Sequence, residues 1–430
     1  MIPSISWKNI WRNRVRSLVV ITAITLGLFG GLFSSAIFKG MSERRFEEAL
    51  SKEITHIQIH NPKYLENPEI GFTIPQPSEL IDFIKSKESV KAVSSRLKIT
   101  AMIGSSSSNY GVNVVGVDPE KEKEVSKLYT ALLSPEEITK QYGIIDPTDL
   151  EQFQADSVGF YFENTRRNPM FIGEELAHKL RIKVRSKVVI TFQNANGNLT
   201  GGAFRVCGIF RTENSVFEQT NVFVRQNDLI GLTGLEAESA HEIAIFLHDV
   251  EQAGELAALL SENYPNLETS DWKTLEPTLA MMTDMMDVTM TIIIVIILLA
   301  LGFGIVNTML MVVMERGKEI GMLMAVGMSK LRVFSMIILE SVLLCLTGAA
   351  AGISISVLLI EIFSSKGIDM TAFAQEGFEA MGFAAVFYPT LGAEFYLEVT
   401  LLVVLTGVLS SVYPAWKALK LNPADALRSE

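Results

Sequence analysis

The fold is decided by the stretch ERGKEIGMLMAVGMSK, residues 315–330, because uncharged chain lies on both sides of it. Residues 288–314 before it contain no charged side chain, and residues 341–360 after it contain none either. About 20 apolar residues in succession are enough to cross a bilayer as a helix. The stretch therefore predicts a short charged connection between two membrane helices.

Two more stretches have the same character: residues 18–38 contain no charge, and residues 396–413 contain only Glu398. The stretch at 18–38 is long for a signal peptide and has no small-residue cleavage site, so it predicts a retained anchor. The expected fold is a membrane α-helical protein with a large α+β domain, residues 39–287, inserted between its first two membrane helices. The four membrane helices are expected at 18–38, 288–314, 335–360 and 396–415.

The basic residues near the helix ends predict the orientation of the chain. Lys and Arg outnumber Asp and Glu in residues 1–17, 315–334 and 416–430, whereas acidic residues dominate residues 361–395. Both termini and the 315–334 segment are therefore expected in the cytosol, and residues 39–287 and the 361–395 loop outside. The outer segment is acidic and the whole chain has a net charge of −11, so no nucleic-acid surface is expected.

Residues 1–17 are expected to form a short amphipathic helix. Apolar and basic residues fall on opposite faces at helical spacing, which suits a helix lying on an anionic membrane surface. A merely solvated basic N-terminus is the alternative. The apolar face consists of Trp7, Ile10, Trp11, Val15 and Leu18, and the basic face of Lys8, Arg12 and Arg16.

The outer domain shows alternating strand and helix patterns. ITHIQIH at 54–60 predicts a strand followed by a helix at 77–90, and HEIAIFL with EQAGELAALLSENYP repeats this order at 241–265. Between them, RLKITAMI with YGVNVVGV and KVVITFQ with AFRVCGIF predict two hairpins. We expect the two end units to pack together, with residues 120–235 forming a subdomain between them. Cys207 and Cys345 cannot meet in this topology, so no intrachain disulfide is expected.

Residues for catalysis are scarce. The chain contains no phosphate loop and no GxSxG motif. His56 and His60 lie about 13 Å apart along one strand, too far to hold one metal by themselves. Glu340 is different, because an ionisable group at the entrance of a membrane helix needs a partner or has a function; capping or snorkelling at the interface is the alternative.

Methionines crowd the expected entry of the second helix into the outer leaflet, at positions 281, 282, 285, 286 and 290. Flexible thioether side chains suit varied apolar shapes such as acyl chains, although ordinary packing is the alternative. We predict an acyl-chain site between the first two helices, where Gly27, Gly30 and Gly31 would loosen the packing. Its expected lining is Leu28, Phe29, Phe33, Met285, Met286 and Ile292.

The 315–330 stretch itself has an amphipathic pattern. One expected helical stripe contains Ile320, Leu323, Met324 and Leu331, and a smaller-sided one contains Gly321, Ala325 and Met328. Such a helix can lie against the membrane and also enter a groove of another protein. Partner docking and plain interfacial packing therefore both remain open.

The same stretch resembles the coupling segment of the MacB, FtsX and LolC/LolE superfamily of ABC-transporter permeases, whose pattern is ER-x-x-EIG-x-L-x-A-x-G. The likeness extends to NIWRNRVRS at the front, to Glu340, Gly348 and Gly352, and to YPAWKALKLNPADALR at the end. GVDPEKE and FIGEELAHKLRIKVRSKVVITFQ resemble the LolC/LolE branch. The residues that match the coupling pattern are Glu315, Arg316, Glu319, Ile320, Gly321, Leu323, Ala325 and Gly327.

This resemblance implies a permease subunit that is not itself an enzyme and binds no cofactor. A separate cytosolic ABC ATPase dimer would hold ATP and Mg, and a second permease subunit, identical or different, would complete the transporter. The implied location is the inner membrane of a Gram-negative bacterium, among membrane lipid. The implied activity is extraction of a lipoprotein from the outer leaflet and its release to a periplasmic chaperone.

The NANGN hairpin is short compared with the chaperone-recruiting hook of LolC, so chaperone recruitment stays open. The alternative function is mechanotransmission, in which ATP hydrolysis moves the periplasmic domain to drive an efflux adaptor or a cell-wall hydrolase. A sensor without an ATPase is disfavoured by the coupling motif.

Overall fold

The computed structural model describes residues 2–106, 108–134, 137–138, 162, 168–372, 377–378 and 383–420, with residues 2–5 and Asp287 described by their backbone alone. The chain divides into two compact units. The first consists of Met1–Glu43, Thr283–Met370 and Val386–Glu430, and the second of Arg44–Met282 and Thr371–Ala385.

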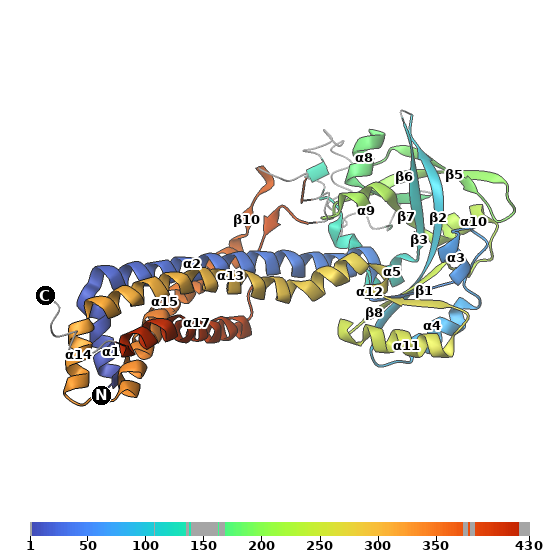
Figure 1. Ribbon diagram of the computed structural model, residues 1–430. Helices are drawn as coiled ribbons and strands as arrows, with labels where there is room; N and C mark the ends of the chain where they lie inside the picture. The colour runs from blue at the N-terminus through green and yellow to red at the C-terminus, as the bar shows by residue number, and fades with distance from the viewer. Residues whose placement is uncertain are drawn as a thin grey trace. The chain divides into compact units, whose positions relative to one another are not determined.

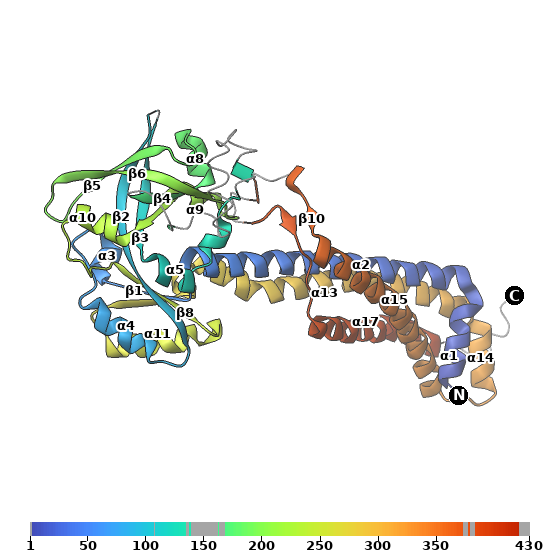
Figure 2. The same ribbon diagram turned by 180° about the vertical axis from the view of Figure 1, so that it is seen from behind.

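Long helices build the first unit, which we call the membrane unit (Figure 1). They are α2 (Arg14–Glu48), α13 (Pro277–Glu315), α15 (Lys330–Lys366) and α17 (Ala393–Leu419), accompanied by the shorter α1 (Ile2–Ile10), η1 (Trp11–Asn13) and α14 (Gly317–Ala325) and by the paired strands β10 (Ile368–Asp369) and β11 (Val386–Phe387). The four long helices are long and apolar enough to cross a membrane, which confirms the predicted fold class. Within this unit α2 and α13 lie side by side in both views (Figures 1 and 2).

Small residues bring the long helices together. A Cβ atom on Gly348 of α15 would lie 2.8 Å from Ile24 of α2, and one on Gly352 would lie 2.9 Å from the Thr25 carbonyl oxygen. The Thr25 hydroxyl donates a hydrogen bond to the Gly348 carbonyl at 3.1 Å. Small residues are common where membrane helices touch, because they let the two backbones approach closely. These two glycines of the predicted motif therefore serve the packing of α15 on α2.

The second unit, which we call the sheet domain, contains a nine-stranded sheet in the order β3-β7-β4-β6-β5-β2-β8-β1-β9. The strands are β1 (Ile57–His60), β2 (Val90–Gly104), β3 (Asn109–Val117), β4 (Pro169–Gly173), β5 (Lys187–Gln193), β6 (Leu199–Phe210), β7 (Asn221–Arg225), β8 (Glu242–Leu247) and β9 (Glu268–Asp271). The helical elements are η2 (Ala49–Ile54), α3 (Pro62–Glu66), α4 (Pro77–Lys85), α5 (Pro119–Val125), η3 (Leu128–Ala131), α8 (Glu174–Leu180), α9 (Ser215–Thr220), α10 (Gln226–Thr233), η4 (Val250–Gln252), α11 (Ala253–Asn263) and α12 (Trp272–Leu275).

Both predicted hairpins are confirmed, since β2 pairs antiparallel with β3 and β5 pairs antiparallel with β6. The pairing of the two end units is confirmed as well, because β1 lies between β8 and β9. The predicted helix at 77–90 is too long: α4 ends at Lys85, and Val90 already belongs to β2. β2 begins early in the chain because it is a long strand: its first part pairs with β8 and its last part with β3 and β5. Val90 is therefore held in the sheet and cannot belong to the helix.

A buried ionic group lies where β2, β8 and α5 meet. Arg96 donates to Glu122 at 2.5 and 3.1 Å and to Glu242 at 2.7 Å, and Lys98 also pairs with Glu242. Burial acts to raise the pKa of Glu242, but Lys98 and Arg96 outweigh it and hold that pKa at about 2. A buried charge needs partners of this kind. The group therefore fixes α5 on the sheet.

Both cysteines are free, as expected. Cys207 is buried in the sheet domain and its thiol donates to the Met170 carbonyl at 3.2 Å. Burial raises the pKa of this thiol to about 12, so it stays protonated and unreactive.

Candidate functional site

Two arginines near the N-terminus bind two glutamates of the 315–330 stretch. The Arg16 guanidinium donates to both carboxylate oxygens of Glu315, at 2.6 and 2.7 Å. Arg12 donates to Glu319 at 2.9 Å and lowers the pKa of that carboxyl. Two parallel hydrogen bonds from one guanidinium to one carboxylate add directional specificity to the charge attraction. The start of α2 is therefore tied to the end of α13 and to α14.

Arg316 supplies the partner that Glu340 was expected to need. Its Nη1 atom lies 3.2 and 3.1 Å from the two carboxylate oxygens of Glu340, and its Nε atom donates to Glu319 at 3.2 Å. Glu340 is only 4% exposed on α15. A buried carboxylate in a membrane helix is tolerated when a cation compensates it, so Arg316 joins α15 to the coupling stretch.

Together these side chains form what we call the ionic cluster: Arg12, Arg16, Glu315, Arg316, Glu319 and Glu340. A cavity of about 240 Å³ lies among them, and Asn9, Thr308 and Leu344 also line it. The cluster connects the N-terminal segment, the start of the coupling stretch and α15. Its members come from three separate segments of the sequence.

The N-terminal prediction needs a correction. Arg12 and Arg16 were expected to face an anionic membrane surface, but they pair with glutamates of the same chain. Ile10 is fully buried against the bundle, whereas Trp7 and Trp11 are partly exposed as predicted for an interfacial face. The missed signal was the spacing: the arginines are four residues apart, as are Glu315 and Glu319. Side chains at this spacing share a helix face and can pair with a complementary face.

The coupling stretch is not one continuous helix. α14 ends at Ala325, Gly327 has a φ of +102°, and α15 begins at Lys330. This left-handed conformation favours glycine and stops the helix. The predicted stripe through Leu331 is therefore wrong, because that residue lies on α15.

The matched coupling residues face different directions. Ile320 and Gly321 are buried in the bundle, Leu323 is half-buried, and Ala325 and Gly327 are exposed. Beside the last two lie Met322, Val326 and Leu331, which are 55%, 84% and 73% exposed. We call Met322, Ala325, Val326, Gly327 and Leu331 the exposed turn.

The predicted acyl-chain residues differ in their surroundings and in their exposure. Leu28 is fully buried and packs against Gly352 of α15, and the Phe33 ring meets that of Phe363 on α15 edge to face. Phe29 stacks on Phe33 at 5.6 Å between ring centroids. On α13, Met286 is buried, whereas Met285 and Ile292 are 56% and 52% exposed.

The expectation that glycines loosen this region is also wrong for Gly27 and Gly31. A Cβ atom on Gly31 would lie 2.8 Å from Ile297 of α13, and one on Gly27 would lie 3.1 Å from Leu301. The missing side chains let α13 approach α2 closely. Only Gly30 faces open space among the three.

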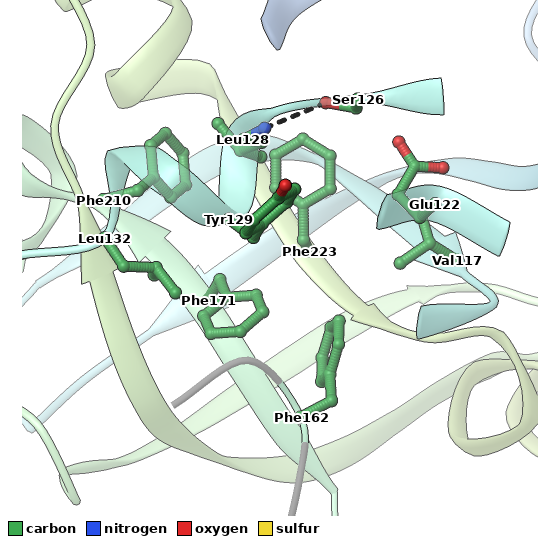
Figure 3. A pocket seen from close by; sticks show the side chains of 10 residues that line it. All are labelled: Val117, Glu122, Ser126, Leu128, Tyr129, Leu132, Phe162, Phe171, Phe210 and Phe223. Carbon is green, nitrogen blue, oxygen red and sulfur yellow. Dashed lines mark hydrogen bonds between the residues drawn. The ribbon is translucent and has the colours of Figure 1, made fainter. Parts of the chain in front are cut away.

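The sheet domain holds an aromatic cavity between β3, β4, β6, β7 and η3 (Figure 3). Phe162, Phe171, Phe210 and Phe223 line it, and its volume of about 10 Å³ is roughly that of one water molecule. The Glu122 carboxylate at its edge is bound by Arg96. In this state the cavity is packed core and leaves no room for a ligand.

The histidines weighed as metal ligands make hydrogen bonds within the protein. The His56 ring accepts from the Leu247 amide at 3.1 Å, and the His60 ring bonds to the His241 carbonyl oxygen at 3.0 Å. In the described part of the chain no three His, Cys, Asp or Glu side chains are grouped to hold a metal. Of the predicted closing motif, Pro414, Ala415 and Ala418 are buried in α17, and Pro423, Ala424, Leu427 and Arg428 lie outside the described residues.

Several known proteins are similar to this chain in sequence. Residues 291–423 match the FtsX-like permease C-terminal family. An uncharacterized ABC transporter permease of Methanocaldococcus jannaschii is 26% identical over 439 residues, covering 100% of this chain and 98% of that protein. MacB, the macrolide export ATP-binding/permease protein of Escherichia coli O157:H7, is 34% identical over 182 residues, which are 41% of this chain and 25% of MacB.

The lipoprotein-releasing system transmembrane protein LolC of Xylella fastidiosa is 23% identical over 281 residues, covering 61% of this chain and 65% of LolC. The family match begins inside α13 and continues through α17, and this part of the chain carries the coupling stretch and Glu340. This chain is an ABC transporter permease of the MacB/FtsX/LolC superfamily.

Proposed function

We propose that this permease uses ATP hydrolysis by a separate cytosolic ATPase to release lipid-anchored protein from the outer leaflet of the membrane to a soluble periplasmic chaperone. The observation that carries the proposal is the ionic cluster, which ties the coupling stretch to α2, α13 and α15. The permease subunit itself contributes binding and motion and no hydrolysis. A second permease subunit, identical or different, completes the transporter in the inner membrane of a Gram-negative cell.

The ATPase would dock on the exposed turn. Val326, between α14 and α15, and Leu331, at the start of α15, are apolar and 84% and 73% exposed, while Glu315, Arg316 and Glu319 are paired inside the ionic cluster. A short apolar tip with small neighbours suits a groove on a partner protein. The charged residues of the motif would then pass the motion of the docked ATPase to the long helices, and would not themselves form the docking surface.

Transmission would run along two uninterrupted helices. α2 continues from Arg14 to Glu48 and α13 from Pro277 to Glu315, and the Arg16–Glu315 pair joins them at the end next to α14. A displacement of α14 is thereby passed to both helices at once. Each helix belongs at one end to the membrane unit and at the other to the sheet domain.

The substrate class rests on the similarity to LolC and on exposed apolar surface of α13 at Met285 and Ile292. Each CH₂ group of an acyl chain contributes about 0.8 kcal/mol to its burial. A lipid anchor therefore leaves the bilayer only when the protein offers apolar surface in exchange.

Mechanotransmission is the second candidate, and one observation favours it. Gly27 and Gly31 hold α2 closely against α13, so the expected cleft between these helices is closed. A permease that moves its outer domain without carrying substrate needs no such cleft. Its partner would be a soluble protein outside the membrane.

Docking is tested by Val326→Asp, with Arg12→Gln as the comparison. We expect Val326→Asp to abolish copurification of the ATPase without changing the thermal stability of the permease, because the side chain touches little of its own chain. Arg12→Gln should keep the ATPase bound but weaken the link between ATP hydrolysis and release. Normal ATPase binding by Val326→Asp would refute the docking surface.

The substrate is tested with a photo-crosslinking residue at Met285 or Ile292, and with Leu405 on α17, which is 52% exposed like Ile292, as the control. Lipoprotein should be captured at the α13 positions without ATP and lost when ATP is added. Capture of a soluble periplasmic protein alone would replace lipoprotein release by mechanotransmission.

A further inference from the structure

A second cavity of the membrane unit is lined by Lys39 of α2 and by residues of α13 and α17. Its volume is about 500 Å³, within the range of small-molecule sites in proteins. All its lining residues belong to the same compact unit. They include Lys39, Val288, Met290, Ile292, Glu394 and Glu398.

The cavity carries charges of both signs. Lys39 comes from α2, and Glu394 and Glu398 come from α17, one helical turn apart on the same face. Lys39 has a partner outside this pair, Glu43, at 3.7 Å. One ammonium and two carboxylates thus line one opening, and a ligand that carries both a cation and an anion matches them.

The remaining lining is apolar. Met290 is buried at the base, while Val288 and Ile292 are more than half exposed at the mouth. Exposed apolar side chains continue from there along both helices, at Ile296 and Leu299 on α13 and at Leu397 and Leu401 on α17. A ligand with a charged head and long apolar chains matches this division.

We propose that this cavity binds a phospholipid whose head carries a primary ammonium next to a phosphodiester, the chemistry of phosphatidylethanolamine. The phosphate accepts from Lys39, and the ammonium donates to Glu394 and Glu398 in charge-assisted hydrogen bonds. The acyl chains lie along the apolar side chains of α13 and α17. Ile292 also belongs to the apolar surface proposed for the lipid anchor of the substrate, but the charges that select the phospholipid head group lie on α2 and α17.

The charges discriminate among common lipids. Phosphatidylglycerol has no cation for the two glutamates, which repel its phosphate. Phosphatidylcholine has a cation without N–H groups, so it cannot donate to a carboxylate. Of these three lipids, only phosphatidylethanolamine offers both a phosphate for Lys39 on α2 and an N–H donor for the two glutamates on α17.

The test measures lipid retained by the purified full-length chain in native mass spectrometry, after exchange into mixed micelles holding phosphatidylethanolamine, phosphatidylglycerol or phosphatidylcholine. We expect roughly fivefold preference for phosphatidylethanolamine, since partly exposed ion pairs contribute modestly. Glu394→Gln/Glu398→Gln and Lys39→Gln should each remove this preference. The matched control is Glu361→Gln, an exposed acid of α15 outside the cavity, which should keep it.

Ile292→Trp provides a test that leaves the charges in place. The larger ring should fill the mouth and reduce retention of all three lipids, with the ATPase still copurifying. Equal retention of the three lipids by the wild-type chain would overturn the proposal, as would an unchanged preference in the double glutamine variant. A disulfide between two copies carrying Cys at position 292 would show that a second copy covers the mouth, and would also overturn it.

Discussion

Replacing Arg316 by Met should destabilise the protein by about 3 kcal/mol, because Glu340 is then buried without its cation. The guanidinium Nη1 atom lies 3.2 and 3.1 Å from the two Glu340 oxygens, and the Glu340 side chain is only 6% exposed. Removing one partner of a buried ion pair costs about 3–5 kcal/mol. We take the lower end, since the adjoining cavity of about 240 Å³ gives the carboxylate some access to water.

The assay is equilibrium unfolding of the purified full chain in mixed micelles, followed by tryptophan fluorescence. The double variant Arg316→Met/Glu340→Gln should regain most of the lost stability, because no charge is then left buried. Arg12→Met is the matched control: its pair with Glu319 is 53% and 45% exposed, so the loss should stay below about 1 kcal/mol. Equal losses for Arg316→Met and Arg12→Met, or a double variant as unstable as the single one, would refute the reasoning.

Other predictions concern packing, pH and orientation. Gly348→Ala should cost about 1–3 kcal/mol in the same unfolding assay, since its Cβ atom would lie 2.8 Å from α2, whereas Gly304→Ala, with nothing within 4 Å, should be neutral. Burial raises the pKa of Glu218 from 4.5 to about 7, so the thermal stability that it contributes at low pH should be lost as pH rises through this range, and Glu218→Gln should remove that slope. A single Cys at Ser106 should react with an impermeant thiol reagent added outside spheroplasts and one at Ser329 should not; labelling of Ser329 would reverse the orientation.

The long helices and the sheet could be predicted because their signals are local. Uncharged runs such as 288–314 identify a membrane helix by length alone, and alternating patterns identify β2 with β3. The break at Gly327 was missed because an amphipathic pattern continues across it, and nothing local shows that its φ is positive.

The ionic cluster could not be derived in full, because it depends on contacts between distant segments. Arg16 and Glu315 are 299 positions apart, and charge alone allowed the arginines to bind either lipid head groups or glutamates. The matching four-residue spacing on both partners was the available clue. Glu340 was recognised as needing a partner or a function, but Arg316 was considered only as a match to the coupling pattern.

The roles of the glycines were the hardest to foresee. A glycine in a membrane helix either weakens packing or permits closer packing, and the choice depends on what faces it. Ile297 lies against Gly31, so this glycine permits close packing of the two helices, whereas Gly30 faces open space.

The central claim is that the Arg16–Glu315 pair passes the motion of the ATPase to α2 and α13. The most direct measurement is the rate at which a fluorescent lipoprotein leaves proteoliposomes containing the complete transporter, chaperone and ATP. Arg16→Glu and Glu315→Arg should each abolish release while the ATPase stays bound, and the charge-swapped double variant should recover much of it. Release at the wild-type rate by either single variant would contradict the account.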